Sequence, residues 1–131
     1  MTGLTPPTFS KRERIVSRKL IEQLFCKDSS HSTSAFPLRI VYMEKERDEG
    51  DEPVLILVSV SKRHFKRAVK RNRVKRQIRE AYRQHKQLLT EKMPQGRQLA
   101  IAFIWLADEF YDSRQVEKSV KRLLWKVAES V

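Results

Sequence analysis

The spacing of apolar and polar residues predicts a helix near the start of the chain, over residues 17–25. Ser17 suits the N-cap, and a stripe of apolar residues follows at helical spacing: Leu20, Ile21, Leu24 and Phe25. Ser10 with Glu13 forms a competing capping box, so the sequence leaves the first residue of this helix open. The polar residues 28–34 predict a loop, in which the pattern leaves a short edge strand open.

Three later segments have the pattern of β-strands. Residues 36–43 and 54–60 are short, apolar and rich in β-branched side chains, and a polar segment with Gly50 and Pro53 separates them. The simplest arrangement of these two strands is an antiparallel hairpin. Residues 98–105 are apolar at nearly every position, which is typical of a strand that is covered on both faces or paired at the centre of a sheet.

Between the second and third strand segments, the spacing of apolar residues changes to that of a helix. Over residues 72–89 the apolar side chains fall within about 120° of the helix circumference, and basic side chains occupy the opposite side. Phe65, Ala68 and Val69 are out of phase with this apolar stripe. We therefore expect a separate turn, or a kink, before Lys70.

The last segment predicts a helix that Asp112 or Ser113 caps. Five apolar residues line one of its faces: Val116, Val120, Leu123, Leu124 and Val127. The elements thus follow the order helix, strands, helix, strand, helix, which predicts an α+β two-layer sandwich with three helices on a small mixed sheet. We expect one domain over residues 1–131, with residues 1–9 flexible.

Composition excludes several classes of protein. With 131 residues, of which 40% are hydrophobic, the chain is large enough to form a core, and wholesale disorder is not expected. The longest apolar run, Leu99 to Ala107, is about half of the roughly 18 residues that a membrane helix needs. The amino terminus lacks the pattern of a secretion signal, so we expect a cytoplasmic protein. The lone Cys26 forms neither an internal disulfide nor a zinc site by itself.

The positive charge of the chain is concentrated in one segment. The formal net charge is +12, and residues 62–83 carry eleven Lys and Arg against the single acid Glu80, a net +10. The opposite charge is segregated as well, because residues 44–53 hold six acids and two bases. We expect this acidic turn to point away from any polyanion that the basic segment binds.

A ladder of Lys and Arg on a rigid helix suits a phosphate backbone, because guanidinium groups pair with phosphate oxygens and each neutralised phosphate releases a counterion. A solvated basic face without a partner is the alternative, but the cations lack neighbouring acids that would relieve their repulsion. A membrane surface is a poorer partner, since the apolar face of the helix is needed to cover the sheet. Charge alone does not distinguish RNA from DNA.

The segment Ser59 to Arg83, SVSKRHFKRAVKRNRVKRQIREAYR, resembles the signature of the bacterial ribonuclease P protein component. Its helix motif is matched position by position, at the following residues: Arg71, Asn72, Arg73, Lys75, Arg76, Arg79 and Glu80. Residues 17–25 look like the first helix of that family, and the remaining strands fall in the expected order. The resemblance implies an αβββαβα fold with a left-handed crossover around the basic helix.

The resemblance also implies a function. It implies a subunit of a ribonucleoprotein endonuclease that removes the 5′ leader from precursor tRNA, with catalysis and Mg²⁺ in the RNA subunit, no catalytic residue or metal site in the protein, and no need for a protein partner. For docking on the catalytic RNA subunit we single out Lys62, Arg63, Lys66, Arg67, Lys70, Arg71, Asn72, Arg73, Lys75, Arg76 and Arg79. For leader binding, in a cleft between the first helix and the sheet, we single out Phe9, Arg18, Lys19, Phe25, Phe36 and Tyr42.

Several of these residues have other interpretations. Asn72 is also a good N-cap, and capping ranks slightly ahead of RNA contact. Core packing is at least as good an explanation for each aromatic residue, and a solvated helix face explains Arg18 and Lys19 equally well. Trp125 lies opposite the apolar stripe of the last helix, either as a stacking platform or, as we favour, half covered by lysine stems.

The chain departs from the family pattern at two places. Ile21 stands where the family often has Phe, which leaves Phe25 as the aromatic residue of the first helix. Residues 63–67 replace a shorter segment that commonly contains Gly, so we expect a different approach to the basic helix.

Two other functions compete with the ribonuclease P assignment. A structural ribosomal protein or an RNA chaperone would share the charge and the fold without a leader cleft. A nuclease in its own right would need carboxylates such as Asp108, Glu109 and Asp112, which capping of the last helix explains better. The three histidines share no motif with a nucleophile or a carboxylate pair, and we expect His85 to be packed.

Overall fold

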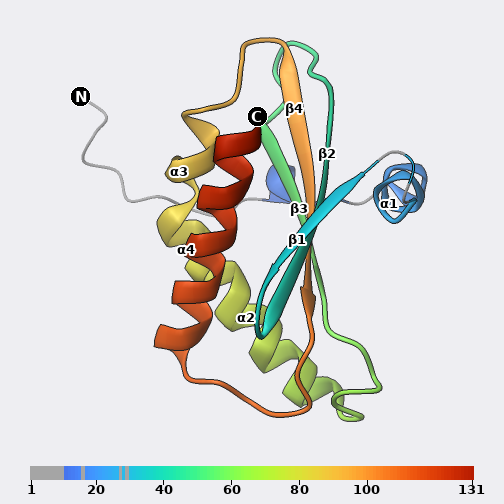
Figure 1. The fold of residues 1–131 in the computed structure, drawn as a ribbon. Helices are drawn as coiled ribbons and strands as arrows, with labels where there is room; N and C mark the ends of the chain where they lie inside the picture. Colours follow the sequence, from blue (N-terminus) through green and yellow to red (C-terminus); the bar gives the residue numbers. More distant parts are fainter. Residues whose placement is uncertain (1–10, 16, 27, 29) are drawn as a thin grey trace.

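A mixed four-stranded sheet in the order β1-β2-β4-β3 lies at the centre of the protein (Figure 1). This computed structural model describes residues 11–15, 17–26, 28 and 30–131. The strands are β1 (His31–Ala35), β2 (Leu38–Glu46), β3 (Val54–Ser59) and β4 (Arg97–Trp105). The helices are η2 (Lys11–Glu13, a 3₁₀ turn), α1 (Arg18–Leu24), α2 (Ala68–His85), α3 (Gln87–Thr90) and α4 (Ser113–Ser130). The α+β class and the order of the main elements are those predicted, with the one-turn helix α3 added.

The predicted hairpin of β2 with β3 is wrong. β2 pairs antiparallel with β4, from Leu38 opposite Trp105 to Glu46 opposite Arg97, and β3 pairs parallel with β4 on its other side. β4 takes the centre because its residues are apolar on both faces, and nearly all of them are buried. The edge strand that the sequence left open is β1, which pairs antiparallel with β2 around a turn that contains Phe36.

The helices cover the two faces of the sheet unequally. α2 and α4 pack side by side on one face, where Ile40, Ile101 and Phe103 of the sheet meet Val74 and other apolar residues of both helices. α1 lies on the opposite face (Figure 1) and packs Leu20 and Leu24 onto Val41, Ala100 and Ala102. The pattern predicted that helices bury one face of the sheet, but it did not place α1 on the other.

The boundaries of the helices follow their caps. Ser17 is the N-cap of α1, where its side chain accepts a hydrogen bond from the Leu20 amide, and Asp112 caps α4 through the Gln115 amide at 2.9 Å. Asn72 is not a cap, because α2 already begins at Ala68, after Arg67. The expected separate turn is present as residues 61–67, but Ala68 and Val69 belong to the helix.

The two ends of the sheet carry opposite charges. The acidic segment between β2 and β3 lies at one end, next to the loop before β4, where the Arg47 amide donates to the Gly96 carbonyl. α2 begins at the other end (Figure 1). The acidic turn therefore lies away from the start of the basic helix. Among the described helices, none is long and apolar enough to cross a membrane.

Candidate nucleic-acid interface

The basic residues predicted for RNA docking form one surface, made by the segment 61–67 and the outer side of α2. Of the ten cations, seven are exposed, and Arg71, Lys75 and Arg79 are half-buried. None of the ten makes an ion pair with any residue that the structure describes. Arg83, one helical turn beyond, contrasts with them, because its Nε donates to Oε2 of Glu80 at 3.0 Å. The charge of the predicted docking residues thus remains available to a polyanion.

Arg14 belongs to this surface, and the sequence analysis missed it. It lies in the short segment that pairs with the free edge of β3, where the Ile15 amide donates to the Ile56 carbonyl at 2.9 Å. A hollow of about 420 Å³ lies between Arg14 and the side of α2, lined by Asn72, Arg76 and Arg79. Burial, and then the charge of Arg14, lower the pKa of Arg79 from its ordinary value. No sequence pattern marks Arg14, because only the folded chain brings it next to α2.

The approach segment (residues 61–67) is held against the loop between β4 and α4. The rings of Phe65 and Phe110 stack with their centroids 4.9 Å apart, and His64 Nδ1 lies 2.6 Å from the Asp108 carboxylate. Arg71 Nη1 donates to the carbonyls of Phe65 and Lys66 at 2.9 and 2.8 Å. Residues 63–67, which depart from the family pattern, therefore have a defined conformation that Arg71 braces. Arg71 has this structural role beside any role in RNA binding.

A second candidate surface lies between α1 and the sheet. Phe25, which is 47% exposed, lines a hollow of about 380 Å³ together with Arg39, Val41 and other residues of the sheet. Arg18 and Lys19 are exposed on the first turn of α1. The sequence analysis missed Arg39 because it did not establish which face of β2 α1 covers. Phe9 lies outside the described residues.

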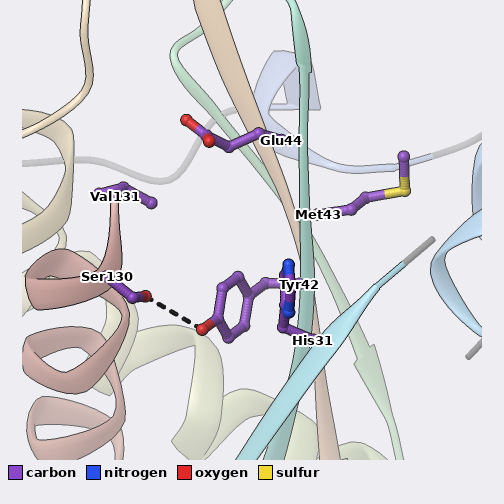
Figure 2. Close-up of a pocket in the computed structure, with 6 residues that line it drawn as sticks. All are labelled: His31, Tyr42, Met43, Glu44, Ser130 and Val131. Carbon is purple, nitrogen blue, oxygen red and sulfur yellow. Dashed lines mark hydrogen bonds between the residues drawn. The ribbon is translucent and has the colours of Figure 1, made fainter. Parts of the chain in front are cut away.

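Phe36 and Tyr42 are not brought to this hollow. Tyr42 points to the opposite face of the sheet, where its hydroxyl lies 3.0 Å from Ser130 Oγ of α4 (Figure 2). It lines a separate hollow of about 290 Å³ with His31 and Glu44. The exposed Phe36 ring packs edge-on against Tyr111, also on the α4 side. Of the three described aromatic residues predicted for leader binding, Phe25 is therefore the one that lies next to α1.

The acidic residues weighed as a nuclease site have structural partners instead. Asp108 pairs with His64, and Asp112 caps α4. His85 is half-buried and lies 2.8 Å from Glu117, so it is packed as expected. Over the described ranges no three His, Cys, Asp or Glu side chains lie close enough together to hold a metal ion. We assign no metal ligand to these residues.

Comparison with known proteins gives one family throughout. The sequence model of the Ribonuclease P family matches residues 9–128. The chain is 42% identical to the ribonuclease P protein component of Porphyromonas gingivalis W83, over 97% of this chain and 93% of that one. It is 31% identical to the ribonuclease P protein component of Chlorobium phaeobacteroides, over 97% and 92% of the two chains.

Solved structures agree at the level of the fold. The RNase P protein from Thermotoga maritima superimposes with a TM-score of 0.66 at 24% identity, over 87% of this chain and 96% of that one. A mutant RNase P protein of Staphylococcus aureus gives a TM-score of 0.67 at 23% identity, over 91% and 90%. With the family model and the curated relatives, these matches establish that the chain belongs to the ribonuclease P protein component family.

Proposed function

We propose that this chain is the RNA-binding protein subunit of a ribonuclease P, which promotes endonucleolytic removal of the 5′ leader from precursor tRNA in the cytoplasm. The observation that carries the proposal is the row of ten cations on and before α2, none of them in an ion pair with a described residue. Membership of the family supports an RNA partner, and in this proposal that partner is the catalytic RNA subunit. The cationic surface docks on that RNA by pairing with its phosphates.

The protein acts by binding and positioning. The apolar side of α2 packs into the core, which makes the helix a rigid support. The cations of α2 lie on its outer side. On the other face of the sheet, Phe25 stacks on a base of the leader, and Arg18, Lys19 and Arg39 neutralise its phosphates. Catalysis and the Mg²⁺ ions belong to the RNA subunit in this proposal. The two surfaces of the protein lie on opposite faces of the sheet, so one molecule holds both RNAs at once.

A structural ribosomal protein or an RNA chaperone is the alternative. Such a protein would use the basic surface alone. The hollow beside α1, with an exposed aromatic ring and a cation at its rim, favours a second and separate ligand, which the ribonuclease P proposal provides.

A reconstitution assay tests the proposal. Precursor tRNA is incubated at low Mg²⁺ with the protein alone, with the ribonuclease P RNA of the same organism alone, and with both. We expect cleavage at the mature 5′ end to be stimulated when both are present, because the protein neutralises phosphates that otherwise need high Mg²⁺. Absence of stimulation would contradict the proposal, and cleavage by the protein alone would favour the nuclease alternative.

Replacing Phe25 by alanine tests the leader surface. Because base stacking on an aromatic ring contributes about 1–3 kcal/mol, Phe25→Ala is expected to weaken binding of precursor tRNA by the holoenzyme about tenfold. Affinity for mature tRNA, which lacks the leader, should not change. Phe36→Ala is the matched control, since it removes an exposed ring on the other side of the sheet. Equal losses for the two variants would show that the hollow beside α1 does not hold the leader.

A further inference from the structure

The outer face of α4 has a composition that the docking surface on α2 does not explain. Trp125 is 58% exposed, whereas the other tryptophan of the chain, Trp105, is 1% exposed. At 100° per residue, Trp125 falls within about 100° of arc with four exposed cations of the same helix, and the group spans about 16 Å along the axis. These cations are Arg114, Lys118, Lys121 and Arg122. We call these five residues the outer face of α4.

The four cations have no acidic partners in the part of the chain that the structure describes. Lys126, on the flank of the same helix, differs from them because its Nζ donates to the Ser34 carbonyl at 3.1 Å. The sequence favoured a ring half covered by lysine stems. Trp125 is 58% exposed, so more than half of its surface stays accessible to a partner. An exposed indole among unpaired cations matches a single-stranded nucleic acid, whose bases stack on aromatic rings while its phosphates pair with Lys and Arg.

The position of this face identifies the occupant. α4 and α2 pack side by side on the same face of the sheet, opposite α1. Arg73 of α2 lies over the Phe110 ring at 4.4 Å, and Gln77 Nε2 donates to the Tyr111 carbonyl, just before α4 begins. Gln77 Nε2 also lies 3.3 Å from Ser113 Oγ, so α2 contacts the first residue of α4, which precedes Arg114 in the sequence. The outer face of α4 is therefore next to the surface of α2, whereas a leader held beside α1 would lie on the other face of the sheet.

A membrane surface fits this face less well. The apolar stripe of α4, which includes Val116, Val120 and Leu123, is fully buried in the core. Trp125 is therefore the single large apolar side chain that α4 presents outward, too little for a helix that binds a membrane by inserting an apolar face.

We propose that the outer face of α4 is a second contact surface for the RNA subunit, with an unpaired base of that RNA stacked on Trp125 and the neighbouring phosphates bound by Lys118, Lys121 and Arg122. This inference rests on the proposed function, in which α2 docks on the same RNA. It extends the protein–RNA interface from one helix to two.

Tryptophan fluorescence tests the proposal, because only one of the two indoles is accessible. The protein is titrated separately with the transcribed ribonuclease P RNA, with precursor tRNA, and with vesicles of anionic phospholipid, and binding of labelled RNA is followed by anisotropy. We expect the ribonuclease P RNA to quench the emission of Trp125. Trp125→Phe should remove that quenching while the dissociation constant for the RNA rises less than about threefold.

Trp125→Ala should weaken RNA binding about tenfold. The triple variant Lys118→Ala, Lys121→Ala, Arg122→Ala should lower the slope of log K against log salt by about 2 to 3.

The outcomes separate the two proposals. If the RNA subunit binds but neither the emission nor the triple variant's salt slope changes, the role of α4 is refuted and docking through α2 stands. Quenching by precursor tRNA alone, by vesicles alone, or by concentrating the protein without RNA would assign the face to another partner and overturn the inference. If no form of the protein binds the RNA, the proposed function itself fails. Circular dichroism establishes that the variants are folded.

Discussion

Replacing Arg73 and Arg76 together by alanine is expected to weaken binding of the RNA subunit at least about 100-fold, because each substitution removes a charge-assisted hydrogen bond to phosphate that contributes about 1.5–3 kcal/mol. Both side chains are exposed on α2 and neither is in an ion pair with a described residue. The fold should remain intact, since the contact of Arg73 with the Phe110 ring contributes only about 0.5–1 kcal/mol at an exposed site.

Filter binding at several salt concentrations measures this effect. The matched control is Arg47→Ala with Lys92→Ala, which removes the same charge from two segments outside α2, the one after β2 and the one between α3 and β4. Arg71→Ala is studied separately, because Arg71 also braces the carbonyls of Phe65 and Lys66. A similar loss for the control pair would mean that net charge, and not the surface of α2, determines the affinity.

Replacing Lys86 by alanine is expected to lower the free energy of unfolding by about 3 kcal/mol, the cost of removing one member of a largely buried ion pair. Lys86 Nζ lies 2.8 Å from Oε1 of Glu13, and the two side chains are only 18% and 7% exposed. The pair joins the turn η2, which precedes α1, to the end of α2. Burial, followed by the charges of Glu13 and Glu52, raises the pKa of the neighbouring Tyr82, so its phenol stays neutral beside this pair.

Urea denaturation of a double-mutant cycle isolates this interaction. The variants are Lys86→Ala, Glu13→Ala and the double variant, and the double variant should lose less than the sum of the single losses. Arg83→Ala is the surface control, because its pair with Glu80 is largely solvated and should contribute no more than about 1 kcal/mol. A loss below that value for Lys86→Ala would show that the Glu13 carboxylate does not depend on this partner.

The spacing of apolar residues along the chain correctly predicted the buried side of α4 and the buried strand β4. The apolar stripe of α4 is fully buried, Asp112 caps it, and the uninterrupted apolar run of β4 lies at the sheet centre. Local pattern does not establish which strands pair, so the simplest hairpin placed β2 beside β3 and left out β4. Asn72 failed as a cap for a similar reason, because residues 68–71 extend the helix without contributing to its apolar stripe.

The cationic surface of α2 was predictable from the sequence, and the hollow beside α1 only partly so. Ten cations within 18 residues mark the region of α2 directly in the sequence. The hollow beside α1 depends on which face of the sheet that helix covers. Because α1 covers the face of Arg39, Phe25 and Arg39 line the same hollow. Phe36 and Tyr42 lie on the other face. Arg14 reaches the basic surface only because its segment pairs with the edge of β3.

A tethered hydroxyl-radical source on α2 tests the central claim most directly. Cys26 is the only cysteine, so Cys26→Ser with Val69→Cys places a single thiol on the exposed side of α2, where Val69 is 79% exposed. With an iron chelate attached there, we predict cleavage of the RNA subunit at a small group of neighbouring nucleotides, and none from the same chelate at Gln95→Cys, which lies in the loop at the far end of the sheet. Equal cleavage from both positions, or cleavage from Val69→Cys confined to precursor tRNA, would contradict docking of the RNA subunit on α2.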